Sequence, residues 1–134
     1  MKKAVTLLLS ALLVFSLVGC GKISSNMYIS NDSSDHYTAG EIHDAFDVAM
    51  DYFRREFRGC TMTAIGYIGD EKWDMVEDYG KQYGAPVIVL VSEFTTGKQG
   101  GDGSLNPNET YSNYKWILVR GEDGRWSHAD HGYG

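Results

Sequence analysis

An amphipathic pattern between Thr38 and Gly59 constrains the fold of this chain more than any other feature. Thr38 and Glu41 form the Thr-x-x-Glu pattern of a capping box at a helix start, and Gly59 suits a left-handed helix end. Apolar residues then recur at spacings of three and four, the period of one helix face: Ile42, Ala45, Phe46, Ala49, Met50, Phe53 and Phe57. We predict a long helix whose apolar face is buried on another element.

The residues after this helix supply a sheet that can cover it. Residues 61–68 are rich in Thr, Ile and Tyr, which is typical of a strand. Asp70 can cap a second helix over about residues 71–82. Three further strands follow, at residues 87–94, 114–120 and 125–133, the last two joined by a tight turn. The predicted class is α+β, with a long N-terminal helix packed on a curved, mainly antiparallel sheet that ends in a three-stranded meander.

The connection over residues 95–113 is unusually long, with nineteen residues that include four glycines and Pro107. Connections beyond about 12–15 residues are usually functional or disordered. We expect this loop to be the most mobile part of the domain and a candidate for contact with a partner. A purely structural loop is the open alternative, because Asn, Asp, Gly and Pro are also the residues that turns require.

An uncharged stretch at residues 4–18 follows Lys2 and Lys3. Its fifteen residues are fewer than the about 20 that cross a bilayer, but they suit the apolar region of a secretory signal peptide. The stretch ends in Leu17-Val18-Gly19-Cys20, which resembles the lipobox of bacterial lipoproteins. The resemblance implies cleavage after Gly19 and a diacylglyceryl group on the thiol of Cys20, which would anchor the protein on the extracytoplasmic face of the cell membrane. An uncleaved anchor or an ordinary secreted protein is the alternative.

The sequence therefore divides into a lipoprotein signal peptide at residues 1–19, a lipidated cysteine with a flexible tether at 20–36, and one domain at 37–134. The tether is predicted because residues 21–36 contain five serines and few apolar residues. Ten basic and eighteen acidic residues follow Cys20. This balance argues against nucleic acid as a partner and against a basic patch for anionic lipids. Cys60 is left without an intramolecular partner, and we expect it to be buried.

The final hairpin and the long first helix carry a second resemblance. Residues 116–120, Asp123-Gly124 and Trp126 resemble the cystatin-like and nuclear transport factor 2-like superfamily. Shorter motifs are similar to those of small bacterial lipoproteins of unknown function: Tyr52-Phe53, Phe57-x-Gly59-Cys60-Thr61, Asn106-Pro107-Asn108 and Gly132-Tyr133. The resemblance spans about residues 37–133. It implies a cavity between helix and sheet that houses binding sites and, in the ketosteroid isomerases, acid–base chemistry.

The last strand holds the candidate ligand-binding residues. Side chains alternate along a strand, so Trp126, His128 and Asp130 are expected on one face, and His131 on the other. If Trp126 faces the core, His128 and Asp130 line the inner cavity. The alternative is a terminal strand whose polar residues lie near solvent. No metal site is predicted, because His128 and His131 point apart and the loop at 102–109 departs from a calcium loop.

These observations favour a non-enzymatic, membrane-tethered module that binds a cell-envelope protein or glycan, with aromatic side chains available to stack on sugars. The alternatives are a small-molecule binder or small enzyme that uses a cavity near His128 and Asp130, and a structural envelope lipoprotein. We expect no cofactor, and a monomer.

Overall fold

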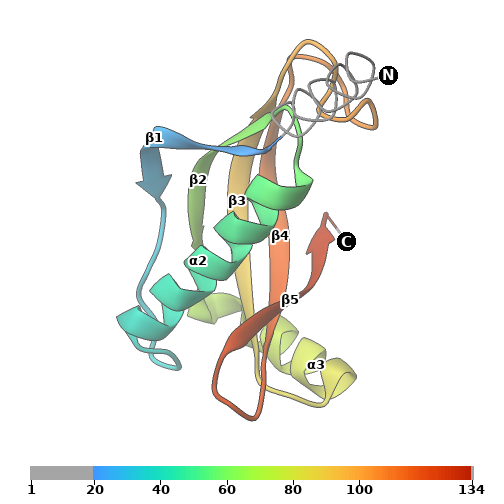
Figure 1. Ribbon diagram of the computed structural model, residues 1–134. Coiled ribbons are helices and arrows are strands. Elements are labelled where there is room, and N and C mark those ends of the chain that lie inside the picture. Colours follow the sequence, from blue (N-terminus) through green and yellow to red (C-terminus); the bar gives the residue numbers. More distant parts are fainter. Residues whose placement is uncertain (1–19, 134) are drawn as a thin grey trace, which may run out of the picture.

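The computed structural model describes residues 20–133, which form an α+β domain with one five-stranded sheet (Figure 1). The elements along the chain are β1 (Lys22–Ile29), α2 (Ala39–Glu56), β2 (Cys60–Tyr67), the 3-10 helix η1 (Asp70–Lys72), α3 (Trp73–Tyr83), β3 (Val87–Thr96), β4 (Thr110–Arg120) and β5 (Trp126–Gly132). The strand order is β1-β2-β3-β4-β5. Strand β1 pairs parallel to β2, and the other pairs are antiparallel. The sheet is therefore mixed, and the predicted antiparallel meander is β3-β4-β5.

Strand β1 corrects the tether prediction. Lys22 pairs with Thr61 and Ile29 pairs with Ile65 on β2, so residues 22–29 belong to the sheet. Ile23 and Met27 pack against the main core. The register of β1 is irregular between Ile23 and Tyr28, which hides the alternation that would mark a strand in the sequence. Backbone pairing to the edge of β2 orders this polar segment, and the domain begins earlier than residue 37.

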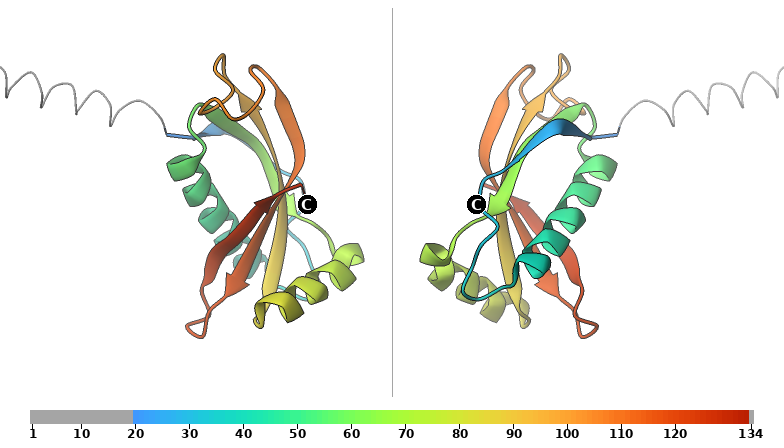
Figure 2. Two further views of the ribbon diagram at one scale, coloured as in Figure 1. Left: turned by 90° about the vertical axis from the view of Figure 1, so that its right-hand side faces the viewer. Right: turned by 90° about the vertical axis from the view of Figure 1, so that its left-hand side faces the viewer.

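Helix α2 lies across one face of the sheet, as predicted (Figures 1 and 2). Both bonds of the capping box form: Glu41 N donates to Thr38 Oγ1 at 3.1 Å, and Thr38 N donates to Glu41 Oε1 at 3.0 Å. The helix ends at Glu56, and Gly59 has its left-handed φ of 72° in the turn that follows. The buried face consists of Ile42, Ala45, Phe46, Ala49 and Phe53, each at most 2% exposed.

Helix α3 lies on the opposite face, over one end of the sheet (Figure 2). Val76 packs there on Val87, Val89 and Ile117, which form a smaller second core. The predicted helix is present, but the side chain of Asp70 makes no cap bond to it. Instead, the Asp70 carboxylate accepts hydrogen bonds from the segment before α2 and from Tyr67 Oη. The hydrogen bond from the Asp35 backbone N–H is the main cause of the lowered pKa of Asp70.

The connection between β3 and β4 is shorter than predicted, because both strands extend and leave only residues 97–109 between them. This loop is bonded to the α2–β2 turn by Gly97 N, which donates to Gly59 O at 3.0 Å. Within the loop, Asn108 N donates to Gly97 O at 3.0 Å. Thr96 Oγ1, at the end of β3, donates to Asn106 O of the loop at 2.6 Å. These bonds favour the structural alternative for the loop, and its mobility remains a prediction.

Replacement of Phe53 by alanine should lower the free energy of unfolding by about 3–5 kcal/mol, the range for a buried phenylalanine. Phe53 is fully buried at the centre of the α2 face. The matched control is Asp47→Ala, an exposed position on the same helix, which should change the free energy by less than about 0.5 kcal/mol. Urea denaturation of both variants measures the difference. An unchanged midpoint for Phe53→Ala would contradict the packing of α2 on the sheet.

Candidate functional site

A β-bulge in β5 decides which residues of the last strand meet. Leu118 pairs with His128, but Ile117 pairs with Asp130, so Ala129 is the extra residue. A bulge shifts the side-chain alternation by one position. His128 and His131 therefore lie on the α2 face, and Asp130 lies opposite Ile117 on the α3 face. The prediction that His128 and Asp130 share a face is wrong for this reason.

The two histidines form a hydrogen-bonded pair, with 2.9 Å between His128 Nε2 and His131 Nδ1. One of these nitrogens donates and the other accepts, so the bond requires at least one neutral ring. Tyr52 stacks on His128, with ring centroids 3.8 Å apart and an interplanar angle of 10°. Burial lowers the pKa of both histidines, and the neighbouring His131 lowers that of His128 further. The pair is therefore neutral at pH 7.

A cleft of about 270 Å³ opens beside this pair, at the C-terminal end of α2. We call it the loop cleft, because residues 97–109 form one of its walls. Its lining combines aromatic side chains with polar ones: Tyr52, Phe57, Tyr114 and His131, together with Glu56, Arg58, Cys60, Asp102 and Ser104. His131 is the only histidine among the residues that line it, while His128 lies behind it against Tyr52.

The protonation states in the loop cleft suit recognition more than nucleophilic chemistry. Cys60 is 2% exposed, as expected. Its burial is the main cause that raises the pKa of the thiol, and the negative charge of the Asp102 carboxylate raises it further. The thiolate is the reactive form, so this raised pKa disfavours attack by Cys60. Asp102 is ionised, because hydrogen bonds from Ser104 lower its pKa. The cleft thus presents a neutral thiol, a neutral imidazole, aromatic faces, the Arg58 guanidinium, and the carboxylates of Glu56 and Asp102, which can accept hydrogen bonds.

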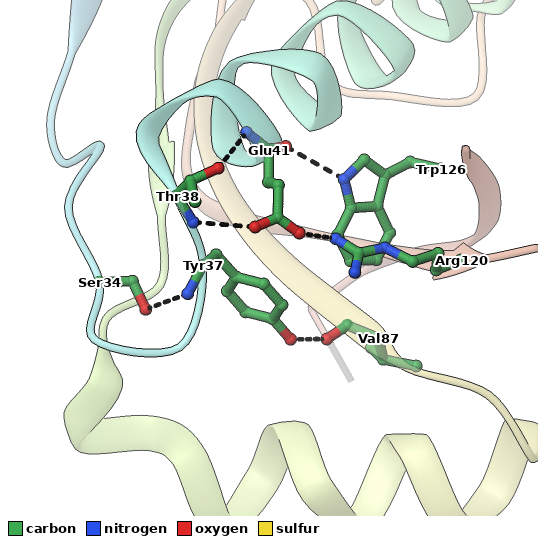
Figure 3. A network of polar contacts seen from close by, with 7 residues as sticks. All are labelled: Ser34, Tyr37, Thr38, Glu41, Val87, Arg120 and Trp126. Atoms are coloured by element: carbon green, nitrogen blue, oxygen red, sulfur yellow. Dashed lines mark hydrogen bonds and ion pairs between the residues drawn. The ribbon is translucent and has the colours of Figure 1, made fainter. Parts of the chain in front are cut away.

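Trp126 lies elsewhere, in the network that fixes the start of α2 to the sheet (Figure 3). It is 7% exposed, and its Nε1 donates to the carbonyl oxygen of Glu41 at 3.0 Å. The Arg120 guanidinium lies over its ring, 4.4 Å from the centroid, and pairs with the Glu41 carboxylate. Tyr37 donates to the carbonyl oxygen of Val87 in the same network. The hydrogen bond from the Thr38 backbone, followed by that from Arg120, lowers the pKa of Glu41.

The three predicted ligand residues therefore occupy three separate places. Trp126 is in the Glu41 network, His128 is in the aromatic cluster, and Asp130 borders a hollow of about 280 Å³ near Tyr83 of α3. A larger apolar groove of about 590 Å³ lies between α3 and the start of β3. Within residues 20–133, no three His, Cys, Asp or Glu side chains are grouped to hold a metal ion.

The residues that meet at the loop cleft were not predicted from the sequence as one site. Tyr52, Cys60 and His131 come from α2, β2 and β5, and Asp102 comes from the loop. Two signals in the sequence pointed to this cleft. One was the long connection at residues 95–113, and the other was the resemblance, since Tyr52-Phe53 and Phe57-x-Gly59-Cys60-Thr61 both contribute residues to the cleft.

We predict that His128 and His131 titrate below the value of about 6.5 that histidine has in an unfolded chain. Burial favours the neutral rings, so their contribution to stability is complete above that pH. It is lost as the pH falls below 6.5 toward the native pKa values. NMR titration of the imidazole protons, in the native and the urea-unfolded chain, measures both values. His128→Gln and His131→Gln variants assign the signals, and native values at or above the unfolded ones would contradict the buried pair.

The chain matches no protein-family model, no curated protein and no solved structure.

Proposed function

We propose that the protein is an extracytoplasmic lipoprotein, anchored in the cell membrane through Cys20, whose domain is a non-enzymatic binding module. Cys20 is exposed, and the next residue already contacts the domain, because Gly21 N donates to Arg54 O at 2.9 Å. This exposed thiol at the lipobox position is the observation that carries the proposal. The proposed signal peptide at residues 1–19 lies outside the described residues. In the described part of the chain, no helix has the length and apolarity needed to span a membrane.

Acyl chains on Cys20 would hold the protein at the membrane. Each CH₂ buried in the bilayer contributes about 0.8 kcal/mol, and two or three chains hold a protein stably where one does not. A lipoprotein receives two chains with its diacylglyceryl group. We propose the outer face of the cell membrane as the location on this basis.

The loop cleft is the binding site that we propose. Its volume of about 270 Å³ is close to the lower end of ligand-pocket sizes, which suits one sugar unit or one side chain of a larger partner. Tyr52 and Tyr114 offer aromatic surface, and the Asp102 carboxylate can accept hydrogen bonds from hydroxyl or amide groups. A glycan or protein of the cell envelope fits these groups.

A small-molecule binder or small enzyme remains the second candidate, now at the His128–His131 pair and not at His128 with Asp130. The hydrogen bond between the two imidazoles, next to the cleft, supports it. Acid–base catalysis is most effective when the pKa lies near the working pH, and burial lowers the pKa of both rings. The lowered pKa values therefore favour binding over catalysis as the role of this histidine pair.

We also propose that the domain is a variant of the cystatin-like and nuclear transport factor 2-like superfamily. Helix α2 packed across the antiparallel strands β2 to β5 supports this relationship. A curved sheet is part of the same proposal. Strand β1, paired in parallel at the edge, is an addition to the arrangement that the resemblance implies.

Cys20→Ala should abolish incorporation of labelled fatty acid when the full chain is expressed in a bacterium, because the acyl acceptor is lost. The matched control is Cys60→Ala, which removes the other cysteine and should keep the label. Radiolabelled palmitate followed by electrophoresis measures both. Label on Cys20→Ala, or its absence from the unaltered protein, would refute the anchor.

A photo-crosslinking amino acid at Ser104, which lines the loop cleft, should capture an envelope protein or glycan in living cells. The control position is Glu122, exposed in the β4–β5 turn, where no product of the same mass is expected. Mass spectrometry identifies what is attached. Equal capture at both positions, or lipid as the sole product at Ser104, would contradict a binding role for the cleft.

A further inference from the structure

We infer that one end of the domain rests directly on the phospholipid bilayer, and this inference rests on the proposed lipidation of Cys20. The anchor end, as we name it, comprises Cys20, the start of β1, the C-terminal end of α2 and the loop of residues 97–109 (Figures 1 and 2). The distal end comprises the start of α2, helix α3 and the turn of residues 121–125. The anchor end would lie at the headgroups, and the distal end would face away.

No tether separates Cys20 from the folded domain, because the next residue already belongs to it. Gly21 is buried, and its N–H donates to Arg54 O at 2.9 Å. A Cβ on Gly21 would collide with the carbonyl oxygen of Phe53 and lie 2.9 Å from that of Phe57. Consecutive Cα atoms are about 3.8 Å apart, so acyl chains on Cys20 begin within a few ångströms of the last turn of α2. The lipid on Cys20 would therefore have little freedom to rotate relative to the domain.

The loop of the anchor end is joined to the end of α2 by direct contacts. The loop is bonded to the α2–β2 turn through Gly97 N and Gly59 O at 3.0 Å. Gly59 also lies so close to the loop that a Cβ would be 3.1 Å from Gly101 O. Whatever surface meets the end of α2 therefore also meets the loop.

Charged residues are distributed unevenly between the two ends of the domain. Five of the ten basic residues after Cys20 are exposed at the anchor end: Lys22, Arg54, Arg55, Arg58 and Lys98. The acidic residues at this end are Asp51, Glu56, Asp102 and Glu109, and Asp51 pairs with Arg54. Acidic residues outnumber basic ones at the distal end: Asp32, Asp35, Asp44, Asp70, Glu71, Asp74, Glu77, Asp78, Glu122 and Asp123. The basic residues there are Lys72, Lys81 and Arg125, besides the ion pair of Glu41 with Arg120. Basic residues near an anionic bilayer are attracted to it within about a Debye length, near 8 Å. Helix α2 is about 27 Å long at 1.5 Å per residue, so the acidic end would lie beyond that range.

This orientation reverses one conclusion drawn from the net charge. The excess of acidic residues argued against contact with anionic lipids, but that excess lies mainly at the distal end. The loop cleft opens at the anchor end, so its ligand would be reached close to the headgroups.

The experiment places an environment-sensitive fluorophore at either end of the lipidated full-length protein. Gln99→Cys labels the loop and Glu122→Cys labels the distal turn, both exposed, in a Cys60→Ala background. The proteins are reconstituted in vesicles of phosphatidylcholine and phosphatidylglycerol that contain lipid with a headgroup nitroxide. Quenching should be several-fold stronger at residue 99 than at residue 122. Adding Arg54→Glu with Arg58→Glu should reduce quenching at residue 99, and the matched control Arg125→Glu, in the distal turn, should not.

Flotation of the vesicles distinguishes a failure of the lipid anchor from a failure of the proposed orientation. Protein that does not float with the vesicles would refute the lipid anchor and this orientation together. Protein that floats but is quenched equally at both positions, or more at residue 122, would overturn the orientation and leave the anchor standing.

Discussion

The burial of one face of α2 on the sheet fixes the position of nearly everything else in this molecule. At its start, the Glu41 carboxylate pairs with Arg120 and its carbonyl oxygen accepts the Trp126 indole N–H, which ties the helix to the final hairpin. At its end, Phe53 lies in the core while the backbone of the same turn accepts the Gly21 N–H. The loop cleft and the site of Cys20 both follow from where this last turn lies.

The sequence predicted α2 well because its signals are local and agree with one another. Capping residues, an apolar stripe and a turn glycine all concern neighbours within about one turn of helix. Strand β1 could not be predicted in this way, because its order comes from backbone bonds to β2, far away in the chain. Its two half-buried apolar residues, Ile23 and Met27, give no regular period, because the register is irregular between Ile23 and Tyr28.

The candidate site was the least predictable part, and one extra residue explains most of the error. Ala129 forms a bulge that exchanges the faces of Asp130 and His131, so the histidine judged to point away is the one at the cleft. Alternation predicts faces only in a regular ladder, and nothing in the residue types marks this bulge. The cleft also joins Cys60 to Asp102 across a long separation in sequence, which only the folded chain brings together.

The net charge of the protein likewise does not describe how its charged residues are distributed over the surface. A net charge describes solubility and average attraction, but not which side of a molecule meets a surface. Here the basic end of α2 and Cys20 occupy the same end of the domain, so covalent attachment and electrostatics would favour one orientation. A domain held in that orientation would extend only a short distance from the bilayer. In that orientation, a partner for the loop cleft would have to reach the membrane surface itself.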